Sequence, residues 1–256
     1  MQAVLEADLR LALDRVAFWR EAGIGEPLPW QERALVSEAP MQLYNCARQS
    51  GKSQVAAALA VHKDLYTPET LVLMVSRTLD HSGELFKRAL KIYRDVGRPV
   101  ETTSETALSL ALENGSRIVA RPGASDVSVR GYTADLLLVD EAARVSNDLY
   151  VSATPVLART EGRIVALSTP FGSRGWFYEE WRSDEGWDRY RITAEDLPED
   201  WYKPSKTTFL ARERRRLGEW WFRQEYFAEF LEAQTQAFRR EDIDAAFSEE
   251  LEAWDL

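Results

Sequence analysis

Apolar residues recur along this chain with two different spacings, and the two spacings alternate. Short continuous apolar runs have the length of buried strands, and between them lie longer segments whose apolar residues recur every three or four positions, as on one face of a helix. Strands are predicted at residues 42–46, 71–75, 136–139 and 163–167, and helices at 4–20, 30–37, 53–66, 79–96 and 147–157. Runs at 107–112 and 117–121 predict a β-hairpin with Asn114–Gly115 in its turn. The alternation predicts an α/β fold with a mostly parallel central sheet flanked by helices.

The sequence changes character after Thr193. Prolines at 198 and 204 precede helical segments rich in arginine and aromatic residues, from about 205 to 231, and an acidic tail begins at Glu232. We therefore expect a core over residues 1–195. Residues 196–256 are expected to form a small C-terminal helical lid subdomain with an acidic tail or linker.

The net charge of −10 argues against a protein that coats nucleic acid, but it is compatible with a local contact to DNA. Candidates for such a contact are the hairpin at Asn114, the segment 77–81 and the arginines at 212 and 214–216. Cys46 is the only cysteine, so no intramolecular disulfide can form, as is usual in a reducing cytosol. No apolar run approaches the roughly 20 residues of a membrane span. We therefore expect a soluble intracellular protein without a membrane partner.

A phosphate-binding motif lies between a predicted strand and a predicted helix. Residues 44–53 end in Gly51-Lys52-Ser53, which matches the end of the pattern G-x-x-x-x-G-K-[ST]. In such a loop, backbone N–H groups surround a phosphate at a helix N-terminus, Lys52 reaches the β- and γ-phosphate oxygens, and the Ser53 hydroxyl binds Mg²⁺. Cys46 departs from the pattern because it stands where the first glycine usually is. The alternative is a chance Gly-Lys-Ser ahead of an ordinary helix.

A second motif follows at 136–141, where four apolar residues lead into Asp140 and Glu141. A buried strand would bring Asp140 to the edge of the sheet beside the phosphate loop, where its carboxylate can hold magnesium-bound water. Glu141 is placed to polarise an attacking water as a general base. The alternative for this pair is the solvated start of a helix. The two motifs together predict a P-loop NTPase of the ASCE type that binds ATP and Mg²⁺.

A third strand, at 163–167, runs into Ser168-Thr169-Pro170. The carboxyl ends of parallel strands meet at the ligand side of a sheet, so Ser168 or Thr169 is placed to contact the γ-phosphate. Taken alone, the tripeptide is also compatible with a simple turn.

These residues resemble the ATPase domain of the large terminase subunits of tailed bacteriophages, the motors that package DNA. The resemblance extends from about residue 29 to residue 247. It rests on Ala47-Arg48-Gln49-Ser50-Gly51-Lys52-Ser53, Leu137-Leu138-Val139-Asp140-Glu141-Ala142-Ala143, Leu167-Ser168-Thr169-Pro170, and Phe222-Arg223-Gln224-Glu225-Tyr226 with Glu229-Phe230. A residue other than glycine at position 46 is itself typical of the phosphate loop of that family.

The resemblance implies further site residues. Gln31 corresponds to an adenine-binding glutamine, whose amide can pair with a donor and an acceptor on the base. Arg48, in the loop with Gln49 and Ser50, would lie close to the γ-phosphate as a second cation. Arg130 matches an arginine finger, which stabilises transition-state charge and is often supplied by a neighbouring subunit. The plainer alternatives are a polar residue at an exposed helix start for Gln31 and a surface salt bridge for Arg130.

The implied function is that of a Mg²⁺-dependent ATPase motor that drives double-stranded DNA into a procapsid. The implied partners are DNA, further copies of the chain in a ring, a portal protein and a small terminase subunit, in the cytoplasm of the host. Family members typically continue into a nuclease domain, which this chain is expected to lack. A helicase-like or other nucleic-acid-stimulated ATPase is the main alternative, although a helicase would need a second core domain. A nucleotide-binding scaffold that hydrolyses little is a third hypothesis, and the presence of Lys52 and Glu141 argues against it.

Overall fold

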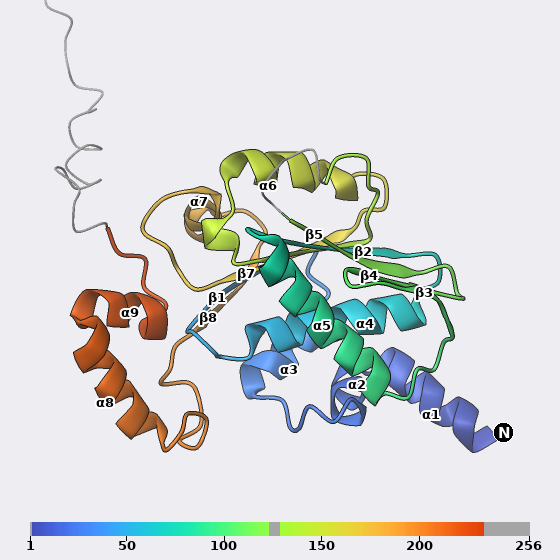
Figure 1. The fold of residues 1–256 in the computed structure, drawn as a ribbon, viewed down its shortest axis with the longest axis horizontal. Helices are drawn as coiled ribbons and strands as arrows, with labels where there is room; N and C mark the ends of the chain where they lie inside the picture. Colours follow the sequence, from blue (N-terminus) through green and yellow to red (C-terminus); the bar gives the residue numbers. More distant parts are fainter. Residues whose placement is uncertain (1, 123–128, 233–256) are drawn as a thin grey trace, which may run out of the picture.

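A twisted sheet with helices on both faces forms the centre of the molecule (Figure 1). The structure is a computed structural model that describes residues 2–122 and 129–232. Within these ranges eight strands form one sheet in the order β3-β4-β5-β2-β6-β7-β1-β8. The strands are β1 (Met41–Cys46), β2 (Leu71–Ser76), β3 (Thr102–Glu105), β4 (Ser109–Leu112), β5 (Arg117–Pro122), β6 (Leu136–Asp140), β7 (Arg163–Ser168) and β8 (Asp188–Ile192). The helices are α1 (Gln2–Leu13), α2 (Arg15–Glu21), α3 (Pro29–Val36), α4 (Lys52–Tyr66), α5 (Leu79–Asp95), α6 (Asn147–Ala153), α7 (Trp176–Arg182), α8 (Lys206–Leu217) and α9 (Glu219–Phe227).

Strands β5, β2, β6, β7, β1 and β8 are neighbours in this order and all pair in parallel. The antiparallel pairs are β3–β4 and β4–β5. The mostly parallel α/β sheet predicted from the sequence is therefore confirmed. Strand β7 lies between β1, which leads into the phosphate loop, and β6, which ends at Asp140.

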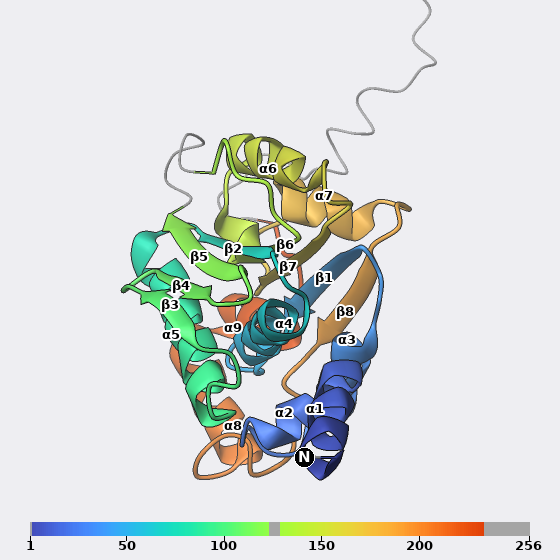
Figure 2. The same cartoon turned by 90° about the vertical axis from the view of Figure 1, so that its right-hand side faces the viewer.

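Two apolar layers cover the sheet because neighbouring residues of a strand point to opposite faces. Val72, Met74 and Leu138 belong to one cluster, together with residues of α2 to α5. Leu73, Val75 and Leu137 belong to the other cluster, together with residues of α6 and α7. Figure 2 shows α4 and α5 on one side of the sheet and α6 and α7 on the other. The central strands are thus buried on both faces, which explains their continuous apolar runs.

The N-terminal segment predicted as one helix is two helices. The carboxylate of Asp14 accepts hydrogen bonds from the backbone N–H groups of Val16 and Ala17, both at 2.9 Å, and thereby caps α2. An acceptor at this position favours a new helix start over continuation of α1.

Three elements lack a clear sequence signal and were not predicted: β3, α7 and β8. Strand β8, with the sequence Asp-Arg-Tyr-Arg-Ile, is polar because it forms an edge of the sheet and pairs on one side with β1.

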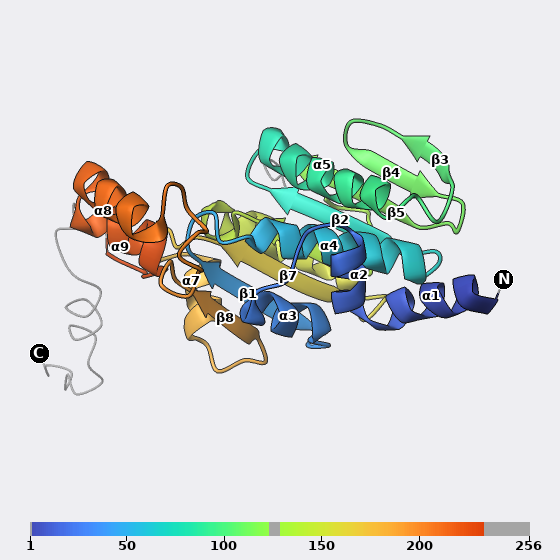
Figure 3. The same cartoon turned by 90° about the horizontal axis from the view of Figure 1, so that it is seen from below.

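The C-terminal helices α8 and α9 lie beyond the carboxyl ends of the parallel strands, at the opposite end of the molecule from α1 (Figure 3). The helical segment predicted to reach residue 231 ends at Phe227, because Ala228 adopts a left-handed conformation with φ 53°. The predicted acidic tail lies outside the described residues apart from Glu232, so the division at residue 196 stays a prediction. No helix in the described ranges is both long and apolar enough to cross a membrane.

Candidate active site

The phosphate loop joins the end of β1 at Cys46 to the start of α4 at Lys52. Two of its residues have positive φ, namely Gln49 at 57° and Gly51 at 92°. A Cβ atom at Gly51 would lie only 2.6 Å from the side-chain nitrogen of Gln31. Glycine is therefore required at this position both by the backbone conformation and by the close approach of Gln31.

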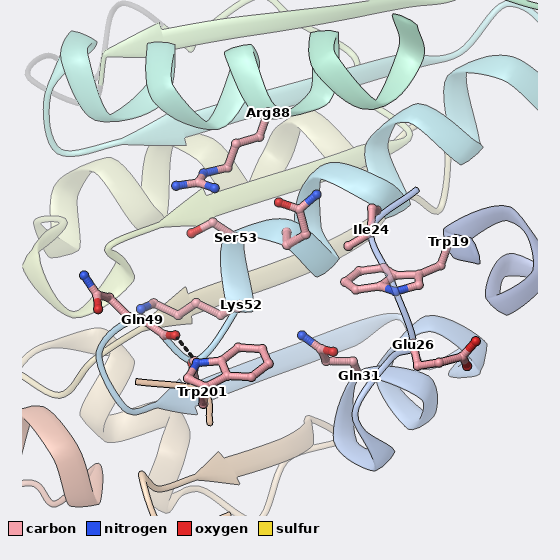
Figure 4. A pocket seen from close by; sticks show the side chains of 12 residues that line it. Trp19, Ile24, Glu26, Gln31, Gln49, Lys52, Ser53, Arg88 and Trp201 are labelled. Carbon is pink, nitrogen blue, oxygen red and sulfur yellow. Dashed lines mark hydrogen bonds between the residues drawn. The ribbon is translucent and has the colours of Figure 1, made fainter. Parts of the chain in front are cut away.

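A cavity of about 590 Å³ opens over the phosphate loop and the first turn of α4 (Figure 4). Six predicted site residues line it: Gln31, Gln49, Ser50, Gly51, Lys52 and Ser53. The structure thus brings the predicted adenine-binding glutamine and the phosphate loop to one cavity.

Six further residues of the cavity wall were missed in the sequence: Trp19, Ile24, Glu26, Gln54, Arg88 and Trp201. They come from α2 and the segment after it, from α4 and α5, and from the segment before α8. No motif links these positions, because they meet only when the elements pack. The sequence signal for Trp201 is that it belongs to a group of tryptophans at 176, 181, 187, 201, 220 and 221.

Gln31 is buried, with an exposed fraction of 2%. Its side-chain oxygen accepts a hydrogen bond of 2.8 Å from the backbone N–H of Leu28, and its nitrogen faces Gly51. This bond fixes the direction of the amide at the cavity wall. The alternative of a polar residue at an exposed helix start is therefore wrong.

The segment before α8 is attached directly to the phosphate loop. The indole nitrogen of Trp201 donates a hydrogen bond of 2.9 Å to the carbonyl oxygen of Gln49. The hydroxyl of Tyr202 donates one of 2.8 Å to the carbonyl oxygen of Arg48. Two consecutive side chains thus hold two consecutive carbonyl groups of the loop.

Asp140 and Glu141 lie at the carboxyl edge of the sheet, on the strand pair β2 and β6, where Ser76 and Asp140 are register partners. Burial raises the pKa of the Asp140 carboxyl, while the charge of Lys52 and the N–H of Glu141 act to lower it. The Lys52 ammonium is therefore close enough to influence this carboxylate. Burial of Asp140 contradicts the alternative of a solvated helix start at that residue. The side chain of Glu141 is 34% exposed and precedes a short 3-10 helix, Ala142–Arg144.

Glu141 has a left-handed backbone, with φ 51° and ψ 37°. This conformation is uncommon for a residue other than glycine, and it turns the chain sharply at the edge of the sheet. The Glu141 carboxylate lies 3.1 Å from Nδ1 of His81, at the start of α5. The segment 77–81, a candidate for DNA contact, is thus adjacent to the predicted general base.

Ser168 and Thr169 are buried at the end of β7, next to Asn45 of β1. The hydroxyl of Ser168 donates a hydrogen bond of 2.7 Å to the carbonyl oxygen of Thr169. Neither residue lines the cavity. They lie between the phosphate-loop strand and the acidic strand, and contact with a γ-phosphate stays a prediction.

Arg48 points away from the cavity, towards α9. Its guanidinium lies 3.5 Å from the carboxylate of Glu225, and the other oxygen of that carboxylate lies 3.7 Å from Arg144. The side chain of Glu225 is 9% exposed, whereas that of Arg48 is 66% exposed. In this structure Glu225 therefore connects the phosphate loop to the segment that follows Glu141. The predicted contact of Arg48 with a γ-phosphate would require the guanidinium to leave Glu225.

Arg130 is exposed and lines a separate hollow formed with Tyr132, Val151 and Pro155. It does not line the cavity over the phosphate loop of its own chain.

The other candidates for DNA contact lie further from the cavity. The side chain of Asn114 donates to the carbonyl oxygens of Asp64 and Leu65, at 2.8 and 3.3 Å, near the C-terminal end of α4. The 15 residues of α4 separate it from Lys52, by about 20 Å at the rise of an α-helix. Three arginines of α8 form ion pairs with Glu213 or Glu219.

Comparison with known proteins identifies the family of this chain. Residues 43–245 match the family described as terminase large subunit, T4likevirus-type, N-terminal. The large terminase subunit of Thermus phage G20c is 26% identical over 244 residues, which cover 81% of this chain and 49% of that protein. The chain thus spans about half the length of the curated relatives that it matches.

Solved structures share the fold. The large terminase ATPase domain of Thermus phage P74-26 aligns with a TM-score of 0.73 and 24% identity, over 84% of this chain and 97% of that one. The large terminase of the thermophilic bacteriophage D6E in complex with ADP aligns with a TM-score of 0.61 and 14% identity, over 86% of this chain and 52% of that one. The resemblance noted in the sequence is therefore confirmed. The chain belongs to the terminase large subunit family and has the fold of the phage large terminase ATPase domain.

Proposed function

We propose that this chain binds ATP and hydrolyses it to ADP and phosphate, and that hydrolysis drives double-stranded DNA into a viral procapsid. The observation that carries the proposal is the cavity shared by Gln31 and the phosphate loop, whose Lys52 also acts on the buried carboxyl of Asp140. Membership of the terminase family and the ADP complex of the D6E relative support it.

The chemistry follows from the position of each group. Lys52 and the N-terminus of α4 stabilise the negative charge of the phosphates. Glu141 is the first residue after β6, at the edge of the sheet near the phosphate loop. From this position its carboxylate orients and polarises the attacking water. Gln31 binds the edge of adenine through its amide.

Magnesium fits the residues at this edge. Asp140 is buried, and the charges of Lys52 and His81 act to lower the pKa of its carboxyl. A buried carboxylate is costly unless a cation or hydrogen-bond donors compensate it. The described residues contain no cluster of three or more His, Cys, Asp or Glu side chains suited to a metal. Mg²⁺ is usually held by one or two protein groups together with substrate phosphates. Ser53 and Asp140 would hold the ion, and the ion would neutralise charge on the phosphates.

Arg130 acts, in this proposal, on the nucleotide of a neighbouring copy of the chain. Its exposure and its position in a hollow separate from its own cavity support this arrangement. A homo-oligomeric ring on a portal protein, supplied with DNA by a small terminase subunit in the host cytoplasm, would bring the copies together. The family match favours this motor over the helicase-like alternative.

Phosphate release by the purified chain tests the proposal. The rate should rise more than in proportion to protein concentration, and duplex DNA should raise it further, because each site needs a neighbour.

Glu141→Ala should retain ATP binding and lower the turnover rate by about 10²-fold or more. Lys52→Ala should weaken ATP binding by about 2 kcal/mol. Unchanged ATP affinity in Lys52→Ala would contradict the assignment of the phosphate site.

A mixing experiment addresses the neighbour. Arg130→Ala should bind ATP normally and turn over slowly. Mixed with Glu141→Ala protein, it should partly recover activity, because one interface in the mixture then combines an intact Arg130 with an intact Glu141. If no mixing ratio restores activity, Arg130 does not act on the nucleotide of a neighbouring subunit: it acts within its own subunit or takes no part in hydrolysis.

A further inference from the structure

Arg88 is a cavity residue to which no motif assigns a role. It lies in the middle of α5, a helix that packs on α4 with the apolar residues Leu85, Phe86, Ala89, Ile92 and Tyr93. This packing fixes the position of the α5 backbone relative to the first turn of α4. The side chain at position 88 projects from the solvated side of the helix, and it is exposed.

The other basic residues on the second half of α5 have acidic partners. Lys87 pairs with Glu84 at 2.7 Å and Lys91 pairs with Asp95 at 2.5 Å, while Arg94 pairs with Glu105. Arg88 makes no hydrogen bond or ion pair with the part of the chain that the structure describes. Its five N–H donors are thus available to a ligand.

The cavity around Arg88 has the charge of a site for a polyanion. Figure 4 shows the guanidinium on the opposite side of the cavity from Trp201, with Ser53 and Lys52 between them. The charged residues of the cavity wall are Lys52, Arg88 and Glu26. Glu26 is already paired with Arg20 at 2.9 Å. The two cations therefore face the cavity without a matching anion among the residues that line it.

We infer that Arg88 binds the phosphate groups of the nucleotide within its own subunit, as a second cation opposite Lys52. A guanidinium suits this task because it donates two parallel hydrogen bonds to phosphate oxygens, whereas an ammonium acts as a point charge. The inference rests on the proposed function, because it requires a polyphosphate in the cavity. It differs from the role predicted for Arg48, which contacts Glu225 and lies outside the cavity wall.

Calorimetric titration of the full chain with ADP and with inorganic tripolyphosphate tests the inference. Arg88→Ala should weaken the binding of both ligands by about tenfold, because both carry the phosphates. Arg88→Lys should lose about threefold, since it keeps the charge but not the paired donors. Lys87→Ala is the matched control: it removes a cation from the adjacent position, where the charge pairs with Glu84, and it should leave both affinities unchanged within twofold.

The outcomes separate this inference from the proposed function. Equal affinity of Arg88→Ala and the wild type for both ligands would overturn the inference. So would a loss confined to ADP, because that result would place Arg88 against the nucleoside. Lys52→Ala serves as the reference for the phosphate site itself. If Lys52→Ala also binds tripolyphosphate normally, the proposed phosphate site fails; if only Arg88→Ala does, the inference alone fails. Unchanged thermal unfolding of Arg88→Ala would show that any loss of affinity arises at the site.

Discussion

Cys46 stands where phosphate loops usually carry their first glycine, and the structure explains why a larger residue is accepted. It is the last residue of β1 and lacks the positive φ seen at Gln49 and Gly51. Its side chain is fully buried, and burial raises the pKa of the thiol to about 12. The thiol is therefore neutral at physiological pH and serves as a small apolar group between the sheet and the loop.

Gly51 is the position in the loop that should tolerate no side chain. Gly51→Ala should lower the free energy of unfolding by about 1–2 kcal/mol, because alanine is disfavoured at φ 92°. It should also weaken nucleotide binding, since the new methyl group would displace Gln31. Denaturant unfolding and ADP titration measure the two effects.

Gly97→Ala is the matched control for that substitution. Gly97 has φ 82° and open space where a Cβ would lie. It should show a similar loss of stability with unchanged affinity for ADP. A similar loss of affinity in both variants would contradict a specific contact between Gly51 and Gln31.

At the scale of single elements, α4 carries phosphate-loop residues at its start and a buried carboxyl group near its end. Its first turn carries Lys52 and Ser53, and its last turns carry the buried side chains of His62 and Asp64. Neither carboxylate oxygen of Asp64 has a hydrogen-bond partner, and burial raises its pKa to about 8. The helix therefore contains a carboxyl group that is protonated in the folded protein at neutral pH.

Asp64 should make stability depend on pH. The unfolded chain ionises this group near its ordinary pKa, but the folded chain does so only near pH 8. The contribution of the neutral carboxyl to the free energy of unfolding is therefore complete below about pH 4. It falls as the pH rises, and it is lost above about pH 8. Asp64→Asn stays neutral and should exceed the wild type by about 2–5 kcal/mol at pH 8.5, with convergence near pH 4. Urea unfolding across this range measures the difference.

Comparison at each pH removes the effect of His62, whose burial lowers its pKa to about 4 and acts in the opposite direction. Asp184→Asn, at an exposed position, serves as the control and should show the pH dependence of the wild type. A pH profile of Asp64→Asn parallel to that of the wild type would show that Asp64 is ionised in the folded protein.

At the scale of the whole molecule, the segment before α8 and helix α9 hold the phosphate loop in place. Trp201 and Tyr202 bind the carbonyl groups of the loop, and the backbone N–H of Arg48 donates to the carbonyl oxygen of Glu225 at 2.8 Å. Asn45 reaches the carbonyl oxygen of Ala228 at 2.9 Å. The segment before α8 and the end of α9 are therefore hydrogen-bonded to the phosphate loop and to the strand that leads into it.

Tyr202→Phe should loosen this connection without removing the ring, which stacks on Phe209. The loss of one hydrogen bond should lower the free energy of unfolding by about 1 kcal/mol. Amide hydrogen exchange at residues 47–51 should become faster. Tyr178→Phe, whose hydroxyl contacts Arg182 on α7, should leave exchange in the loop unchanged. Equal exchange in the loop for Tyr202→Phe and the wild type would show that the hydroxyl does not restrain it.

The sequence by itself determined the central strands, the phosphate loop and the acidic pair. These features are local: an apolar run is buried on both faces wherever it lies, and a Gly-Lys-Ser turn between a strand and a helix presents its N–H groups without help from distant residues. The position of Asp140 at the end of the apolar run 136–139 is likewise visible in the local sequence.

Only the tertiary structure decided which distant residues complete the site. It placed β7 between β1 and β6, brought Trp201 and Arg88 to the cavity, and seated Glu225 between Arg48 and Arg144. Each of these meetings joins elements that are far apart in the chain, and their positions follow from the packing of whole helices on the sheet. Polar or single aromatic residues at such positions have the same local pattern as ordinary surface residues, so the sequence alone does not distinguish them.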